Sequence, residues 1–287
     1  MAATYNTLYL DARRALKAAG ADAPQLEAQE LLRFACGKTK EELYRDMALY
    51  PSTEVARRFQ ALLDRRPAGE PVAYLLGEWE FYGLPLDISP DVLIPRDDTE
   101  VLARQAILRT QEVSGEARVL DLCAGSGCVG LAVAAQCPHA NVILGDISEA
   151  ALRVCRQNIR RNSLTARVSS CQLDAREKPS SALWDFDVIA ANPPYIPTGD
   201  LSGLDVSVRD YEPHLALDGG PDGLDFYRAI TEKWLSALRL GGYLICEVGA
   251  GQAPQVELLF AQHGLTDIQT YPDTNQIWRV VEGRLDG

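Results

Sequence analysis

The sequence predicts an α/β protein: a doubly wound, mostly parallel sheet preceded by an all-helical N-terminal domain and a connecting β-hairpin. Residues 1–66 show only the three- and four-residue apolar spacing of helices. From about residue 97, short apolar runs alternate with helical segments, as in right-handed β-α-β units. We therefore expect a helical domain over residues 1–75, a linker and hairpin over 76–96, and the large domain over 97–287.

The expected helical domain carries recognisable start and stop signals. Asp22 and Pro24 are placed to open its second helix, and Gly37 is placed to close it. The run from Arg65 to Pro71, rich in Pro and Gly, is expected to be a linker. The four expected helices occupy residues 5–16, residues 26–35, a segment opened by the capping box at 39–42, and residues 55–63.

The large domain offers five apolar runs as strands of the parallel sheet. Two further candidates, 267–271 and 276–282, are separated by a short turn and should form a hairpin that adds an antiparallel edge strand. The hairpin expected between the domains surrounds Gly83 and Ser89-Pro90-Asp91. The five parallel candidates are residues 119–122, 142–146, 166–168, 188–191 and 243–247.

Composition excludes several classes of function. The net charge of −12 argues against duplex DNA or RNA as the main partner, because phosphate backbones call for basic patches. No run of 18 apolar residues and no secretion signal is present. The seven cysteines form no CxxC pair, and the three histidines lack metal-ligand spacing. These features predict reduced thiols in a cytoplasmic protein without a metal site.

A glycine loop follows the first strand of the large domain. Residues 125–130 spell G-x-G-x-x-G, which matches the dinucleotide fingerprint, but Asp121 stands at the strand end where pyrophosphate would lie. A carboxylate there repels pyrophosphate and attracts a cation, such as the ammonium group of S-adenosylmethionine. Asp146, at the end of the second strand, can accept two ribose hydroxyls. S-adenosylmethionine is the favoured ligand and NAD the alternative. Asp174 lies either beside the adenine or in a solvated loop.

The tetrapeptide Asn192-Pro193-Pro194-Tyr195 follows a buried strand. The Asn192 side-chain oxygen and the Pro193 carbonyl can accept the two N–H groups of a planar amide or amino group. The prolines fix the backbone, and Tyr195 can lie flat against the conjugated group. The alternative is a turn without a ligand. Glu247 is expected to be an ordinary strand-end residue, whereas Arg96 contacts either a substrate or an acid of the sheet.

Longer motifs make the chain similar to the HemK/PrmC family, the bacterial protein-(glutamine-N5) methyltransferases that modify class-1 peptide chain release factors. The resemblance covers nearly the whole chain. The first and last of its motifs are more specific than Asn-Pro-Pro-Tyr, which adenine-N6 methyltransferases share. The motifs lie at residues 69–77, 80–86, 92–96, 125–130, 192–197, 212–217 and 219–227.

The resemblance implies a class I methyltransferase fold, S-adenosylmethionine as cofactor, and the glutamine of the release factor's Gly-Gly-Gln motif as substrate. It implies that the N-terminal domain helps to bind the release factor, and we expect a monomer. Asn192, Pro193 and Tyr195 would be catalytic, and residues 192–195, including Pro194, would hold the glutamine. The residues implied in cofactor binding are Asp121, Cys123, Ala124, Gly125, Ser126, Gly127, Asp146, Asp174 and Asn192.

Three departures from the family pattern accompany the resemblance. Asp97-Asp98 stands where Pro-Glu is usual, Ala175 replaces a frequent tryptophan, and residues 272–279 differ from the usual final turn. Rival functions are a ribosomal-protein glutamine methyltransferase with the same pocket, an adenine-N6 nucleic-acid methyltransferase acting on an extruded base, and a non-catalytic cofactor sensor.

Overall fold

The computed structural model describes residues 3–21, 23–66 and 69–286. Its contacts divide the chain into two compact units. The first unit comprises residues 1–77 together with 206–211, and the second comprises residues 78–205 and 212–287. Among the described residues, no helix is both long and apolar enough to cross a membrane.

The first unit is helical. Capping side chains begin three of its helices: Thr4 accepts from Thr7 N, Ser52 from Val55 N, and Thr39 forms the expected capping box with Glu42. Gly37 ends the second helix in the left-handed conformation, as expected. The helices are α1 (Tyr5–Ala18), α2 (Pro24–Cys36), α3 (Lys40–Asp46), α4 (Thr53–Arg65), α5 (Val72–Leu76) and α9 (Val206–Arg209).

The helical unit continues beyond residues 65–71, where a linker is expected. Val72, Leu75 and Leu76 of α5 pack into the same apolar cluster as Leu31 and Phe59, so the chain stays in the helical unit as far as Gly77. A five-residue helix was missed because its apolar run is too short to show a period. Asp22 and the linker residues Pro67 and Ala68 lie outside the described residues.

The second unit begins with the expected hairpin, formed by β1 (Glu78–Phe81) and β2 (Leu84–Asp87). Tyr82 and Gly83 both take positive φ, as a two-residue turn requires. The hairpin is tied to α8 (Glu149–Arg161), where Arg161 pairs with Glu78 at 2.7 Å and with Asp87 at 2.5 Å.

The described residues of the second unit form a seven-stranded sheet in the order β5-β4-β3-β6-β7-β9-β8. The first five strands pair in parallel, and β9 runs antiparallel to both β7 and β8. The predicted doubly wound sheet and its closing hairpin are thus confirmed. The strands are β3 (Ala117–Leu122), β4 (Ala140–Asp146), β5 (Val168–Gln172), β6 (Phe186–Ala191), β7 (Leu238–Glu247), β8 (Leu265–Pro272) and β9 (Trp278–Leu285).

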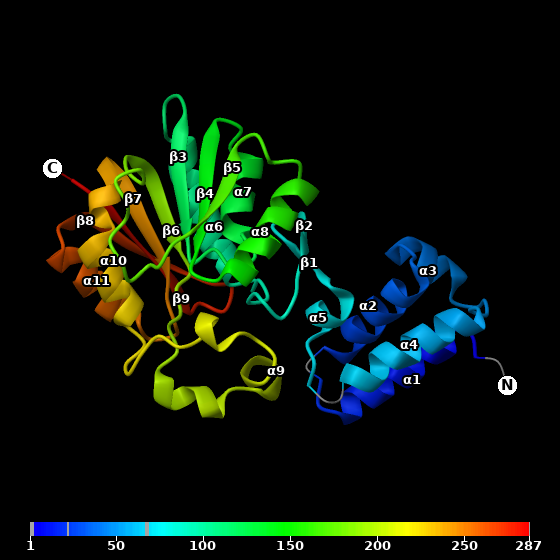
Figure 1. Ribbon diagram of the computed structural model, residues 1–287. Coiled ribbons are helices and arrows are strands. Elements are labelled where there is room, and N and C mark those ends of the chain that lie inside the picture. Colours follow the sequence, from blue (N-terminus) through cyan, green and yellow to red (C-terminus); the bar gives the residue numbers. More distant parts are fainter. Residues whose placement is uncertain (1–2, 22, 67–68, 287) are drawn as a thin grey trace. The chain divides into compact units, whose positions relative to one another are not determined.

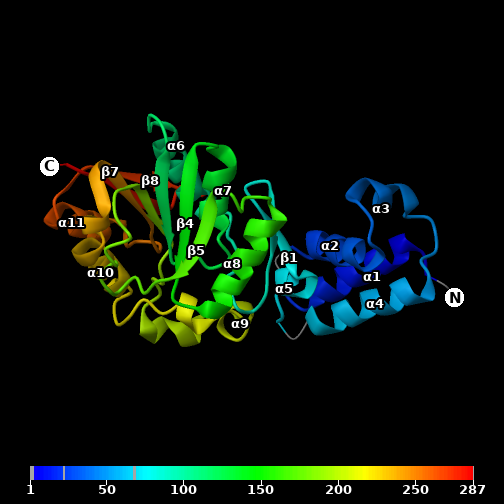
Figure 2. The same cartoon turned by 45° about the horizontal axis from the view of Figure 1, so that its top comes forward.

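Helices cover both faces of this sheet (Figures 1 and 2). On one face lie α6 (Thr99–Gln111), α7 (Cys128–Gln136) and α8, and on the other lie α10 (Asp225–Lys233) and α11 (Ala253–Gln262). In the described part of the second unit, the short 3₁₀ turns η2 (Thr198–Gly203), η3 (His214–Ala216) and η4 (Leu235–Ala237) lie in the connections. β4 and β6 pair with opposite edges of β3, so the topological switch point of the sheet lies at β3.

One predicted strand is displaced. Residues 166–168 were expected to be extended, but β5 starts at Val168, and Ala166 and Arg167 lie in a turn. The Arg167 guanidinium donates to three backbone carbonyls, those of Ala134, Cys137 and Ala140. Its side chain therefore closes the end of α7, an interaction that an apolar pattern cannot reveal.

Candidate active site

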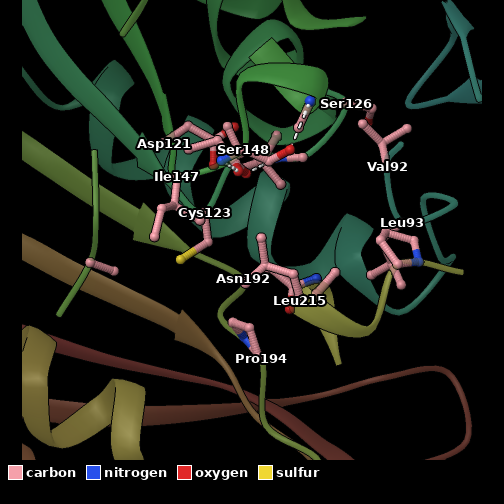
Figure 3. A pocket seen from close by; sticks show the side chains of 18 of the residues that line it. Val92, Leu93, Asp121, Cys123, Ser126, Ile147, Ser148, Asn192, Pro194 and Leu215 are labelled. Carbon is pink, nitrogen blue, oxygen red and sulfur yellow. Dashed lines mark hydrogen bonds between the residues drawn. The ribbon is translucent and has the colours of Figure 1, made fainter. Parts of the chain in front are cut away.

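A cavity opens at the carboxyl ends of β3, β4 and β6 (Figure 3). In the close view Asp121, Cys123 and Asn192 lie around it, with Val92 and Leu93 across from them. Most of the predicted site residues line this cavity. They are Asp121, Cys123, Ala124, Gly125, Ser126, Asp146, Asp174, Asn192 and Pro194.

The glycine loop turns sharply between β3 and α7. Cys123, Gly125 and Gly127 all take positive φ, so the backbone curls under the cavity before α7 begins at Cys128. At Gly130 a Cβ atom would overlap Leu144 and lie 3.0 Å from the Asp121 Cβ. The third glycine of the motif thus permits close packing of helix on sheet.

Asp146 closes the loop from the neighbouring strand. Its Oδ2 accepts from Gly125 N and its Oδ1 from Ser148 N, both at 2.8 Å. Burial raises the pKa of Asp146, and these backbone N–H groups oppose that rise. A carboxylate has about four acceptor sites, so Asp146 can still accept from a diol in the cavity.

Asp121 is more deeply buried than the sequence suggested. The side chain is 2% exposed, and Oδ2 accepts from Gly130 N at 2.8 Å, at the start of α7. Burial raises the pKa of Asp121 to about 7, with the hydrogen bond from Gly130 acting in the opposite direction. A cation beside it would favour the charged form.

Asp174 lies in the cavity wall and forms an ion pair with Arg176 at 3.1 Å. Burial tends to raise the pKa of Asp174, but the Arg176 guanidinium outweighs it, and the net pKa is below the usual range. The guanidinium of Arg176 also lies 5.6 Å from the ring of Phe226. Ala175, at the position of the frequent tryptophan, is buried, and its carbonyl accepts from Trp234 Nε1.

Asn192 follows β6 and turns its amide nitrogen toward the protein. Nδ2 donates to Thr99 Oγ1 at 3.3 Å, at the start of α6. Pro194 shares the cavity wall with Asn192. Among the predicted site residues, Gly127, Pro193 and Tyr195 do not line the cavity. Tyr195 instead packs against the main apolar cluster, and its carbonyl accepts from Gln252 Nε2 at 2.9 Å.

Several cavity residues belong to no chemical motif of the sequence, because they are apolar and distant from the glycine loop and from Asn192. Leu93 comes from the segment before α6, Leu215 from η3, and Phe226 from α10. Leu215 is 52% exposed. Arg96 pairs with the buried Glu212, which lies in the loop before η3 and not in the sheet. In the described part of the chain, no group of three or more His, Cys, Asp or Glu side chains could hold a metal ion.

Comparison with known proteins defines the class first. One family model, PrmC N-terminal domain, matches residues 7–77, and another, Methyltransferase small domain, matches residues 99–204. The human Mettl16 catalytic domain, in a complex with an RNA hairpin, aligns over 82% of this chain and 83% of its own with a TM-score of 0.56 at 14% identity, which shows a shared fold. The second unit thus has the fold of class I methyltransferases.

Two curated relatives narrow the class to a family. The release factor glutamine methyltransferase of Geobacter sulfurreducens is 41% identical over 266 residues, 93% of this chain and 91% of the relative. That of Moorella thermoacetica is 42% identical over 264 residues, 92% of each chain. The chain belongs to the release factor glutamine methyltransferase family, which confirms the resemblance found in its motifs.

Proposed function

We propose that this protein methylates the side-chain amide nitrogen of the glutamine in the Gly-Gly-Gln motif of class-1 release factors, with S-adenosylmethionine as donor. The observation that carries the proposal is the orientation of Asn192. Its Nδ2 is committed to Thr99, which leaves Oδ1 as a hydrogen-bond acceptor in the cavity wall. An acceptor is what the N–H groups of a primary amide require.

The cavity has the chemistry to hold S-adenosylmethionine. Asp121 and Asp146 supply carboxylates for its ammonium and ribose groups, and Ile147 and Phe226 supply apolar walls for an adenine. The Ser126 hydroxyl is buried in the loop without a hydrogen-bond partner. When bound, the cofactor supplies a methyl group on a positively charged sulfur. This set of residues fits that ligand better than a pyrophosphate, which two carboxylates would repel.

Orientation is the main contribution of Asn192 and its neighbours. An amide nitrogen is a poor nucleophile because its lone pair is delocalised into the carbonyl group. We propose that Asn192 Oδ1, in the cavity wall, accepts one N–H group and aims the nitrogen at the methyl carbon. We propose that the Pro193 carbonyl, which lies outside the cavity wall, accepts the other N–H group once the substrate is bound. These N–H groups become more acidic as the new bond forms, so both acceptors bind the transition state more strongly than the ground state. Orientation of this kind can lower a barrier by several kcal/mol, up to roughly 7–11.

Proton removal needs no base from the protein. Burial holds the pKa of Tyr195 well above its usual range, so the phenol stays protonated at neutral pH. We propose that Tyr195, packed against the apolar cluster, supports the Pro193-Pro194 turn from behind, and that the extra proton leaves to water after transfer.

The helical unit is the proposed contact for the release factor. It exposes Tyr44, Leu49 and Tyr50, whose exposed fractions are 60%, 56% and 66%, and large apolar side chains of this kind are common in protein interfaces. With a component of translation as substrate, we place the enzyme in the cytoplasm, acting as a monomer.

A methylation assay with three substrates tests the proposal. The protein would be incubated with labelled S-adenosylmethionine and either a release factor, a ribosomal protein or DNA, and the modified residue located by mass spectrometry. We expect label only on the glutamine of Gly-Gly-Gln. A release factor with Gln→Ala at that position is the matched control. Label on the ribosomal protein or on adenine would establish a rival function instead.

A further inference from the structure

A second buried acid lies behind Asn192. Glu247 ends β7, and the register pairs Ala191 with Cys246, so Asn192 and Glu247 come next on adjacent parallel strands. Glu247 is 2% exposed, and its Oε2 accepts no hydrogen bond. A buried carboxyl oxygen without a hydrogen-bond donor lowers the stability of the folded protein, which points to a functional role for Glu247.

Thr99 connects the two residues. It is 2% exposed, its Oγ1 accepts from Asn192 Nδ2 at 3.3 Å, and both side chains lower the pKa of the Glu247 carboxyl by acting on it as donors. Threonine has one hydroxyl proton. While that proton is donated to the Glu247 carboxylate, the Thr99 oxygen can only accept, and Asn192 must offer it Nδ2. The amide oxygen of Asn192 then faces the cavity.

Protonation of Glu247 would remove this constraint. A neutral carboxyl can donate its own O–H to Thr99, whose proton is then free to turn toward Asn192. Asn192 could satisfy that donor with Oδ1 by flipping its amide. The cavity would then meet an NH₂ group, a donor facing the N–H groups of the substrate.

Burial is the largest influence on this carboxyl and raises the pKa of Glu247 to about 7; the hydrogen bonds from Thr99 and Asn192 oppose the rise. The charged group Arg279 on β9 also lowers the pKa, and Asp98 before α6 raises it. The other titratable groups facing Glu247 are neutral ones: Tyr195 after β6, Tyr227 on α10 and Cys128 on α7.

We propose that Glu247 is a positioning residue: its carboxylate sets the direction of the Thr99–Asn192 hydrogen bonds so that Asn192 presents oxygen to the substrate amide. The inference rests on the proposed function for its catalytic consequence, but the orientation of Asn192 can be measured without a substrate. The proposal differs from the expectation that Glu247 is an ordinary strand-end residue, and the experiments below decide between the two.

The kinetic test compares Glu247→Gln with wild type at saturating cofactor from pH 6 to 8.5. Wild-type kcat should fall about tenfold per pH unit below the pKa of about 7, as expected for one essential ionisation. Glu247→Gln should lose about tenfold in kcat at pH 8.5, as a misdirected contact does, and show a flat profile. The fall of kcat below pH 7 is the acidic limb of this profile. A wild-type kcat and an unchanged acidic limb in Glu247→Gln would overturn the proposal.

Control variants separate positioning from structure. Glu282 on β9 is a second buried glutamate with an unmatched Oε2, and it pairs with Arg109 instead of facing Asn192 and Thr99, so Glu282→Gln should keep the acidic limb. Asp121→Asn should keep it as well, although Asp121 has a similar pKa. Thr99→Ser retains the hydroxyl and should keep the limb, whereas Thr99→Val should lose it. Loss of the limb in Asp121→Asn alone would assign it to Asp121 and overturn the proposal.

A measurement without substrate keeps the proposal testable if the release factor proves not to be methylated. With ¹⁵N-asparagine labelling, the Asn192 side-chain amide resonance should shift as pH passes through about 7 in wild type and stay constant in Glu247→Gln. A missing shift in wild type would refute the positioning role. Absent methylation with a normal shift would refute only the proposed function.

Discussion

The two sides of the cavity are built in different ways. On the glycine-loop side, carboxylates accept from backbone N–H groups near them in sequence: Asp121 from Gly130, nine residues on, and Asp146 from Gly125, 21 residues away. On the Asn192 side, the contact that orients the amide joins side chains 93 residues apart. The first side is a local motif closed by its own backbone, and the second exists only when β6, β7 and α6 are assembled.

This difference predicts how each side responds to substitution. Substitutions in the local motif should weaken cofactor binding and folding, because its glycines and carboxylates hold the backbone in place. Substitutions on the Asn192 side, which distant side chains form, should lower kcat while the fold is retained. The predictions below test that separation, from the largest expected effect to the smallest.

Asn192→Ala should give the largest effect. Removing one preorganised hydrogen-bonding group from a reacting centre typically lowers kcat about 100- to 1,000-fold. S-adenosylhomocysteine affinity, measured by calorimetry, should fall only a few-fold, since Asp121 and Asp146 remain. The exposed Asn141→Ala on β4 is the control. Unchanged turnover in Asn192→Ala would contradict the proposed role of Asn192 in orienting the substrate amide.

Asp146→Ala should act on the other side. It removes the acceptor for Gly125 N and Ser148 N and the proposed partner of the ribose. Losing hydrogen bonds to a charged group costs about 1.5–3 kcal/mol, which corresponds to a roughly 10- to 100-fold weaker cofactor affinity. Asp64 is an exposed residue of α4, and Asp64→Ala should bind the cofactor normally. Equal affinity in both variants would show that the two sides are not separable in this way.

Gly130→Ala should lower the free energy of unfolding by about 1–3 kcal/mol, as overpacking of a tight core does. The added Cβ would overlap Leu144 and press on Asp121. Gly203→Ala, where nothing lies within 4 Å, is the matched control. Urea unfolding of both variants measures the difference, and equal midpoints would contradict the close packing of α7 on the sheet.

Stability without cofactor should fall as pH rises from about 5.5 to 7. The folded pKa values of Asp121 and Glu247, about 7 each, lie above those of the unfolded chain, so the folded state holds more protons in this window. Each group should account for about 2 kcal/mol over this range. Asp121→Asn should remove about half of the loss in urea titrations at pH 5.5 and 7. An equally steep loss in that variant would place the cause elsewhere.

Two departures from the family pattern prove to be connected. Asp98, in the altered segment before α6, and Asp273, in the altered turn between β8 and β9, each lie 3.0 Å from a nitrogen of Arg279. Asp273 Oδ1 also accepts from Asn275 N and Ile277 N, which fixes the turn. Residues 175 apart in sequence thus meet on one guanidinium, and no local pattern reveals their relation.

The sequence by itself determined the alternation of strands and helices, the glycine loop with Asp121 and Asp146, and the tetrapeptide at 192–195. These depend on backbone conformation and on apolar periodicity, which neighbouring residues dictate. Only the tertiary structure decided that α5 belongs to the helical unit, that Tyr195 packs into the core and that Asn192 turns its nitrogen toward Thr99. The direction of a side-chain hydrogen bond depends on which donors and acceptors the assembled fold brings within 3–4 Å, and residues distant in the chain supply them.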